Sequence, residues 1–124
     1  MCDVGLQNND TVFATNLVGT KPLNMPLELL ERILTQAKSS MPSVKIGYAF
    51  TEPLVYPHLV PSLEIANELL LFTSITTNGL TLPQKADDLS RVGLNEINVS
   101  LDGPAAIHNE IRGNSKSFQK AVQG

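Results

Sequence analysis

Apolar residues along this chain recur with two different periods, which predict helices and strands in alternation. Residues 25–38 predict a first helix whose buried face would carry Leu27, Leu30, Ile33, Leu34 and Ala37. A second helix is predicted at 58–70, with Leu63, Ala66, Leu69 and Leu70 on its buried side. The remaining segments are strands at 43–50, 72–76 and 95–101, a helix from Thr81 to Gly93, and helical pieces at 104–112 and 115–123. The predicted order is α-β-α-β-α-β-α.

Three polar side chains stand just past the three predicted strands. Glu52, Asn78 and Asp102 are separated by 26 and 24 residues (78 − 52 and 102 − 78). Strands that alternate with helices at this spacing pair in parallel through right-handed crossovers. The loops at the carboxyl ends of such strands build the functional sites of α/β proteins. We therefore expect the three residues at one edge of a parallel sheet.

The third strand predicts a sheet with one polar face. Ile97, Val99 and Leu101 would point to one side, and Asn98, Ser100 and Asp102 to the other. A sheet covered by helices on both faces would be apolar on both faces. The pattern favours a curved barrel, or part of one, with a polar lumen, although edge strands with a solvated face would give the same alternation. On the first strand, Tyr48 and Phe50 are expected on the lumen side.

Composition and charge narrow the class of protein. The chain has 124 residues, 42% of them hydrophobic and 17% charged, which indicates a soluble globular protein with one domain at most. A net charge of −3 gives no reason to expect nucleic acid or an anionic membrane as a partner. The first residues do not resemble a signal peptide, and the single cysteine cannot form an internal disulfide. A cytoplasmic location is expected.

Four short motifs occur in an order that resembles a known enzyme family. "TEP", "TTNG", "SLDG" and "H-x3-RG" follow one another between residues 44 and 124. Together they resemble the core of radical S-adenosylmethionine (radical SAM) enzymes, especially the sulfatase-maturing and peptide-modifying branch. The resemblance implies an α/β fold, a partial (β/α)6 TIM-like barrel, of which this chain would supply three parallel strands, the second to the fourth.

The resemblance also implies a role for Cys2. Family members bind a [4Fe–4S] cluster through a C-x3-C-x2-C loop, and "MC" at residues 1 and 2 resembles the end of that loop. Cys2 would then be the third ligand, with two cysteines three and seven positions before it; a free thiol is the alternative. One thiolate cannot hold such a cluster alone. Residues 1–124 would thus be a fragment of the core domain, truncated at both ends, with 1–24 the tail of the cluster loop and an irregular connection, and 25–124 the βα repeats.

The loops after the first two strands match positions that bind SAM in the family. Phe50, Thr51 and Glu52 stand where family members have Gly-Gly-Glu, whose backbone carbonyls receive the amino group of SAM. Because both glycines are replaced, close approach of the backbone to the cofactor is less assured. Glu52 could offer its carboxylate to the SAM ammonium or serve as a helix cap. Thr76 and Asn78 could contact the ribose or the substrate.

The third loop and the following helix match the carboxylate-binding positions of the family. By resemblance, Ser100 contacts SAM and Arg112 grips its carboxylate, a task that suits a guanidinium with donors in a fixed fork. The alternative for Arg112 is a surface ion pair with Glu110 or Asp102. Asp102 is interpreted as a turn-former, and His108 as a structural residue.

The implied activity is reductive cleavage of SAM to a 5′-deoxyadenosyl radical, which abstracts hydrogen from a substrate. The substrate is unknown, with a peptide or protein as one candidate, and the reductant would be a flavodoxin or ferredoxin. The isolated chain is expected to be inactive and to self-associate. Two other classes stay open: a TIM-barrel enzyme that uses Glu52 and Asp102 as an acid–base pair, and a non-catalytic, truncated or degenerate homologue that acts by association.

Overall fold

A computed structural model of the chain describes residues 23–49 and 51–124 and contains a three-stranded sheet. The strands are β1 (Lys45–Tyr48), β2 (Phe72–Thr77) and β3 (Glu96–Val99), in the order β1-β2-β3. Both pairs are parallel, with Tyr48 opposite Ile75 in one ladder and Ile75 opposite Ile97 in the other. The predicted parallel α/β fold, part of a TIM-like barrel, is confirmed.

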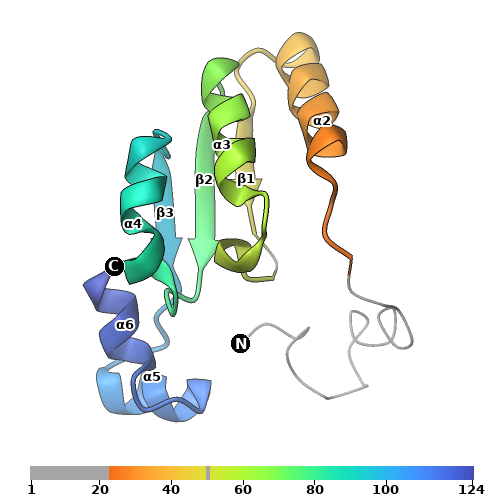
Figure 1. The fold of residues 1–124 in the computed structure, drawn as a ribbon. Coiled ribbons are helices and arrows are strands. Elements are labelled where there is room, and N and C mark those ends of the chain that lie inside the picture. Colours follow the sequence, from red (N-terminus) through yellow and green to blue (C-terminus); the bar gives the residue numbers. More distant parts are fainter. Residues whose placement is uncertain (1–22, 50) are drawn as a thin grey trace.

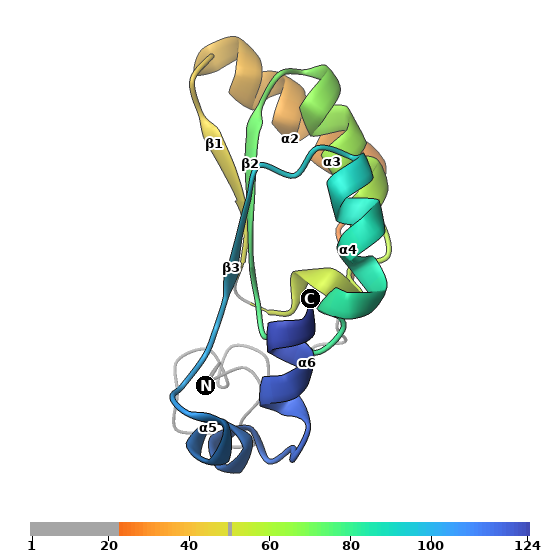
Figure 2. The same cartoon turned by 90° about the vertical axis from the view of Figure 1, so that its left-hand side faces the viewer.

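Helices cover one face of this sheet. The helical elements are α2 (Leu27–Ser40), the short 3-10 helix η2 (Pro53–Val55), α3 (Leu59–Glu68), α4 (Leu82–Arg91), α5 (Ala105–Arg112) and α6 (Ser117–Gln123). Figure 2 shows α2, α3 and α4 together on one side of the strands, whose other side carries no described helix. In Figure 1, α5 and α6 lie past the carboxyl ends of the strands. The predicted one-sided arrangement is therefore observed in the described part of the chain.

The core lies between β2 and the helices. Its larger cluster of buried side chains consists of Leu54, Leu59, Leu63, Ile75, Leu82, Leu89 and Val92, and a smaller one of Leu34, Ala66 and Leu71. Because α3 contributes to both clusters, it joins α2 and α4 into one layer over the sheet. Ile75, in the middle of the central strand, has no exposed surface.

Two side chains predicted on buried helix faces are exposed. Ile33 is 41% exposed, because among the described helices α2 packs against α3 and presents only the stripe around Leu34 to the core. Leu70 is 81% exposed, because α3 ends at Glu68 and Leu70 adopts a left-handed backbone with φ 54°. That conformation turns its side chain away from the core while Leu71 N–H donates to the Ala66 carbonyl.

Tyr48 lies on the opposite face of the sheet from the one predicted. It packs against the larger core cluster, and its hydroxyl donates to Ser62 Oγ of α3 at 2.9 Å. The lumen-side prediction is wrong because the register places Tyr48 beside the buried Ile75. Gly47 and Ala49, the alternate residues, are the exposed ones. Phe50 lies outside the described residues.

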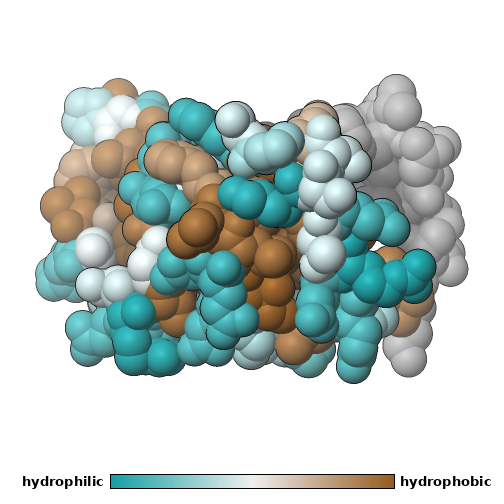
Figure 3. Space-filling model, turned by 90° about the horizontal axis from the view of Figure 1, so that it is seen from above, coloured by the Kyte–Doolittle hydropathy of each residue, from teal (hydrophilic) through white to brown (hydrophobic). Residues whose placement is uncertain are grey.

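Exposed apolar side chains occur at the end of the molecule where the strands begin. Figure 3 views this end and shows hydrophobic residues gathered between hydrophilic ones. Met41, which is 56% exposed, directly follows α2, and Leu70 lies two residues past the last residue of α3; both helices end here. Among the described helices, none combines the length and apolar character that a membrane crossing needs.

Candidate functional site

The loops after the three strands meet at one edge of the sheet, as predicted. Glu52 Oε2 accepts the backbone N–H of Asn78 at 2.8 Å, which joins the loops after β1 and β2. Ser100 N–H donates to the carbonyl of Thr77 at 2.9 Å, which extends the β2–β3 pairing to the third loop. Parallel pairing brings these three segments together although they are far apart in the sequence. We call this region the carboxyl edge.

The carboxylate of Glu52 clamps the first two loops of the carboxyl edge. Its Oε1 accepts from Leu54 N–H at 3.1 Å and from Thr77 Oγ1 at 2.5 Å, in addition to the Asn78 bond of Oε2. It therefore caps η2, the structural alternative that the sequence left open. An ionised carboxylate has about four acceptor positions, so three bonds leave room for one more donor.

The turn after β2 is organised by its own polar side chains. Asn78 Oδ1 accepts from Leu80 N–H at 2.9 Å, and Thr77 Oγ1 accepts from Gly79 N–H at 3.0 Å. Thr77 is buried and was not singled out from the sequence. The strand alternation could have predicted its burial, because Thr77 stands between Thr76 and Asn78, which were expected on the other face of the sheet. The Asn78 side chain thus shapes the turn itself.

Two of the remaining predicted residues, Thr76 and Ser100, lie near this edge on the open face of the sheet, the side that carries no described helix. Thr76 and Thr51 are exposed, and Ser100 is half-buried. Thr76 faces the open side because its neighbour Thr77 points into the core. Ser100 does so because its neighbour Val99 packs against the core cluster. The polar row that the sequence predicted on this face is therefore present.

Arg112 forms a two-pronged ion pair with Asp102. Its Nε donates to Asp102 Oδ2 at 2.5 Å and its Nη2 to Asp102 Oδ1 at 3.1 Å, and Nη2 also lies 3.5 Å from the Ser100 carbonyl. The hydrogen-bonded Arg112 guanidinium holds the pKa of the Asp102 carboxyl below its usual range. Asp102 is thus the carboxylate partner of Arg112 as well as part of a turn, and the ion pair that was the alternative for Arg112 exists.

His108 anchors the helices that follow β3. It is fully buried, and its ring contacts the loop after β3 on one side and α6 on the other. These contacts agree with the prediction that His108 has a structural role. The carboxyl edge therefore rests on α5 and α6 as well as on the sheet.

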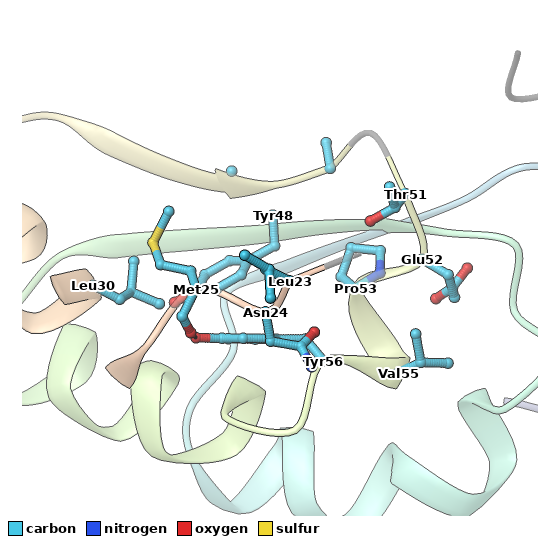
Figure 4. A pocket seen from close by; sticks show the side chains of 12 residues that line it. Leu23, Asn24, Met25, Leu30, Tyr48, Thr51, Glu52, Pro53, Val55 and Tyr56 are labelled. Atoms are coloured by element: carbon cyan, nitrogen blue, oxygen red, sulfur yellow. Dashed lines mark hydrogen bonds between the residues drawn. The ribbon is translucent and has the colours of Figure 1, made fainter. Parts of the chain in front are cut away.

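A cleft opens beside the outer edge of β1. Its volume is about 360 Å³, and it lies between the start of α2, β1 and the loop that follows β1. Figure 4 shows Thr51 and Glu52 at one end and Met25 and Leu30 at the other. The Tyr56 hydroxyl donates to the Met25 carbonyl at 2.7 Å, which ties the start of α2 to this wall. The Glu52 carboxylate accepts hydrogen bonds from Thr77 and Asn78, which do not line the cleft.

The described residues include no candidate metal centre. Cys2, the predicted cluster ligand, lies outside the described residues. Within residues 23–49 and 51–124, no three His, Cys, Asp or Glu side chains gather in a way that could hold a metal ion.

Comparison with known proteins gives a family match over nearly the whole chain. Residues 2–124 match the sequence model of the radical SAM superfamily. A GTP 3′,8-cyclase of Mycolicibacterium smegmatis is 40% identical over 81 residues, which cover 64% of this chain and 22% of that protein. Molybdenum cofactor biosynthesis protein 1 of Bos taurus is 34% identical over 109 residues, which cover 83% of this chain and 17% of that protein.

These comparisons correct the expected branch. The relatives are GTP cyclases and molybdenum cofactor biosynthesis proteins, so the expected likeness to sulfatase-maturing enzymes is not supported. The four motifs therefore predicted the superfamily correctly but not the branch within it. The chain spans about a fifth of the length of these relatives.

Proposed function

Because this chain belongs to the radical SAM superfamily, we propose that it forms part of the barrel of an enzyme that acts on GTP. Members of this family use a [4Fe–4S] cluster and SAM. The proposal depends chiefly on the match over residues 2–124 and on the names of the relatives. The polar open face, bordered by the Glu52 clamp and the Arg112 pair, supports it.

The carboxyl edge offers groups that suit the amino-acid end of SAM. That end carries an ammonium and a carboxylate. Glu52 keeps an acceptor position for the ammonium, beside the backbone of Thr51. Ser100 and Arg112 could take the carboxylate, because Arg112 Nη1 is not used in the bonds to Asp102. Thr76 and Asn78 would lie nearest to the ribose or the substrate.

The cluster would be held by Cys2 together with thiolates from elsewhere in the whole protein. Residues 1–24 would be the tail of the cluster loop and its connection, and residues 25–124 the βα repeats of the core domain. When bound, cluster and SAM supply the radical that abstracts hydrogen from the substrate. The residues of this chain would bind and orient the cofactor.

The proposed substrate is a nucleotide, in place of the peptide that the motifs had suggested. The name of the Mycolicibacterium smegmatis relative states cyclisation of GTP between positions 3′ and 8. A net charge of −3 gives this chain no overall attraction for a triphosphate, so local cations of the whole protein would have to bind it.

An acid–base enzyme that uses Glu52 and Asp102 receives no support from the contacts. The Glu52 carboxylate accepts three structural hydrogen bonds, and Asp102 is paired with Arg112. An Asp102 carboxyl whose pKa is lowered by Arg112 is ionised near neutral pH and has no proton to give.

The proposed function is tested with the full-length protein, reconstituted anaerobically with iron and sulfide. We expect 5′-deoxyadenosine to form from SAM when a reductant and GTP are present, with loss of GTP. ATP in place of GTP is the matched control. Release of 5′-deoxyadenosine without any consumption of GTP would reject GTP as the substrate, and absence of SAM cleavage would reject the radical SAM activity.

The role of Arg112 is tested by SAM titration of Arg112→Lys in the same protein. Loss of a charge-assisted hydrogen bond from Nη1 to the SAM carboxylate costs about 1.5–3 kcal/mol, so we expect binding to weaken by about tenfold to a hundredfold. Arg91→Lys is the control, since Arg91 makes exposed ion pairs with Glu64 and Asp88 on the helical layer. Equal SAM affinities of Arg112→Lys and Arg91→Lys would show that Arg112 does not bind SAM.

A further inference from the structure

His108 lies at the centre of a buried network that joins α5, α6 and the loop after β3. Its side chain has no exposed surface. Asp102 N–H donates to its Nδ1 at 3.2 Å, and its Nε2 lies 3.0 Å from Ser117 Oγ. Phe118 packs edge-on against the ring, with centroids 5.9 Å apart. Each ring nitrogen therefore has its own partner, in a different segment of the chain.

These partners indicate which ring nitrogen carries the proton. Because a backbone N–H can only donate, the Nδ1 that accepts it carries no proton. The single ring proton is then on Nε2 and is donated to Ser117 Oγ. Asp102 Oδ2 lies 3.4 Å from Nδ1, but this approach is not an ion pair, because Nδ1 is the acceptor of the Asp102 N–H.

The same loop residue connects this network to Arg112. The main chain of Asp102 is bonded to His108, and its carboxylate is bonded to Nε and Nη2 of Arg112. His108 and Arg112 stand four residues apart on α5, so they lie on one face of that helix. Asp102 is therefore held at two points, and the orientation of its carboxylate follows from both.

We propose that His108 is a positioning residue for Arg112: by fixing the main chain of Asp102, it orients the carboxylate that holds the guanidinium at the carboxyl edge. In the whole protein this would set the affinity of Arg112 for the carboxylate of SAM, a consequence that rests on the proposed function. The hydrogen bond between Nε2 and Ser117 joins α5 to α6. It involves neither Asp102 nor Arg112, so its loss should affect stability and not the position of Arg112.

Two substitutions separate the two ring nitrogens. In His108→Asn, the amide oxygen stands near the position of Nδ1 and can still accept the Asp102 N–H, whereas the bond to Ser117 is lost. In His108→Gln, the amide nitrogen stands near the position of Nε2 and can still donate to Ser117, whereas the acceptor for Asp102 is lost. Ser117→Ala removes the second bond without touching the ring.

The first measurement is SAM titration of the full-length protein and these variants, with Tm as the measure of stability. We expect Tm to fall in all three variants, because each loses one buried hydrogen bond. SAM binding should weaken by about tenfold in His108→Gln alone. Equal weakening in His108→Asn and His108→Gln, or unchanged binding in both, would overturn the positioning role.

The second measurement needs no SAM and separates this inference from the proposed function. The Nε–H of Arg112 is bonded to Asp102, and its NMR signal reports that pair by slow exchange with water. We expect the exchange to accelerate at least tenfold in His108→Gln but to stay unchanged in His108→Asn and Ser117→Ala. If the full-length protein binds no SAM, the proposed function is wrong. The exchange of the Arg112 Nε–H still tests whether His108 positions Arg112. Equal exchange in the two His108 variants would overturn it.

Discussion

At the scale of single residues, the carboxyl edge depends on two carboxylates with different partners. Glu52 accepts hydrogen bonds from backbone and hydroxyl groups of the first two loops. Asp102 is paired with a guanidinium from α5. Both side chains therefore hold loops in place, and each can be tested by replacement with its amide.

Glu52→Gln should destabilise the protein by about 1–3 kcal/mol. The amide nitrogen that replaces one carboxylate oxygen would face a donor, the N–H of Asn78 or Leu54 or the hydroxyl of Thr77, and leave it without an acceptor. Urea unfolding measures the change in the free energy of unfolding. Glu68→Gln, at an exposed position of α3, is the control. The clamp has no stabilising role if the two variants unfold alike.

The pair between Asp102 and Arg112 should make stability depend on pH below about 4. The Asp102 pKa is lowered in the folded state by Arg112, while in the unfolded chain it has its ordinary value of about 3.9. The stabilisation is therefore complete above that value and is lost as the pH falls through the lower, folded pKa. We expect the Tm difference between the wild-type protein and Asp102→Asn to close on acidification below about pH 4.

Asp87→Asn supplies the control for that pH series. Asp87 is exposed on α4, so its replacement removes one negative charge away from the carboxyl edge. A Tm difference for Asp102→Asn that stayed constant from pH 7 to pH 2 would show that the Arg112 pair does not stabilise the fold.

At the scale of elements, α6 packs closely on the turn after β2. A Cβ built on Gly79 would lie 2.8 Å from the Ala121 Cα, and Gly79 has φ 76°. Glycine is required here both for its backbone conformation and for the close approach of α6. Gly113, at the end of α5, has φ 61° but nothing within 4 Å of its built Cβ.

The two glycines form a matched pair for substitution. Gly113→Ala should cost only the strain of a left-handed alanine, about 1 kcal/mol. Gly79→Ala should cost about 1–3 kcal/mol more, because α6 must also move away from the turn. Urea unfolding of both variants measures the difference. Equal costs would mean that α6 does not pack closely on this turn in solution.

At the scale of the whole molecule, the sheet has two outer strands. Within the described residues, β1 and β3 each pair only with β2. Outer strands present backbone donors and acceptors that can pair with another chain. We therefore expect the 124-residue chain by itself to self-associate as its concentration rises, which sedimentation can measure.

A charge on the outer strand should oppose this association. Ile97, on β3, is 39% exposed, and Ile97→Lys would place a lysine on the edge strand. Ile33, on α2, is 41% exposed and gives the matched control Ile33→Lys. We expect Ile97→Lys to raise the concentration needed for association severalfold and Ile33→Lys to leave it near the wild-type value. The reverse order would place the contact on the helical face.

The sequence by itself determined the order of elements, the parallel sheet, its polar face and the position of the three polar loops. These features follow from the periodicity of apolar residues, which reflects the backbone geometry of helices and strands, and from the sequence distance between the polar loops. It also indicated the family, since the four motifs keep their order. It misplaced Leu70 and Tyr48, because helix ends and strand register depend on contacts between distant segments.

Only the tertiary structure decided what the polar side chains of the carboxyl edge do. Glu52 meets Thr77 and Asn78 because β1 pairs with β2. Asp102 meets both His108 and Arg112 because α5 folds back on the loop after β3. A hydrogen bond needs its two atoms within about 3 Å, whereas the sequence records only which side chains are available. Residue types therefore predicted the chemistry of this edge, and the fold assigned the partners.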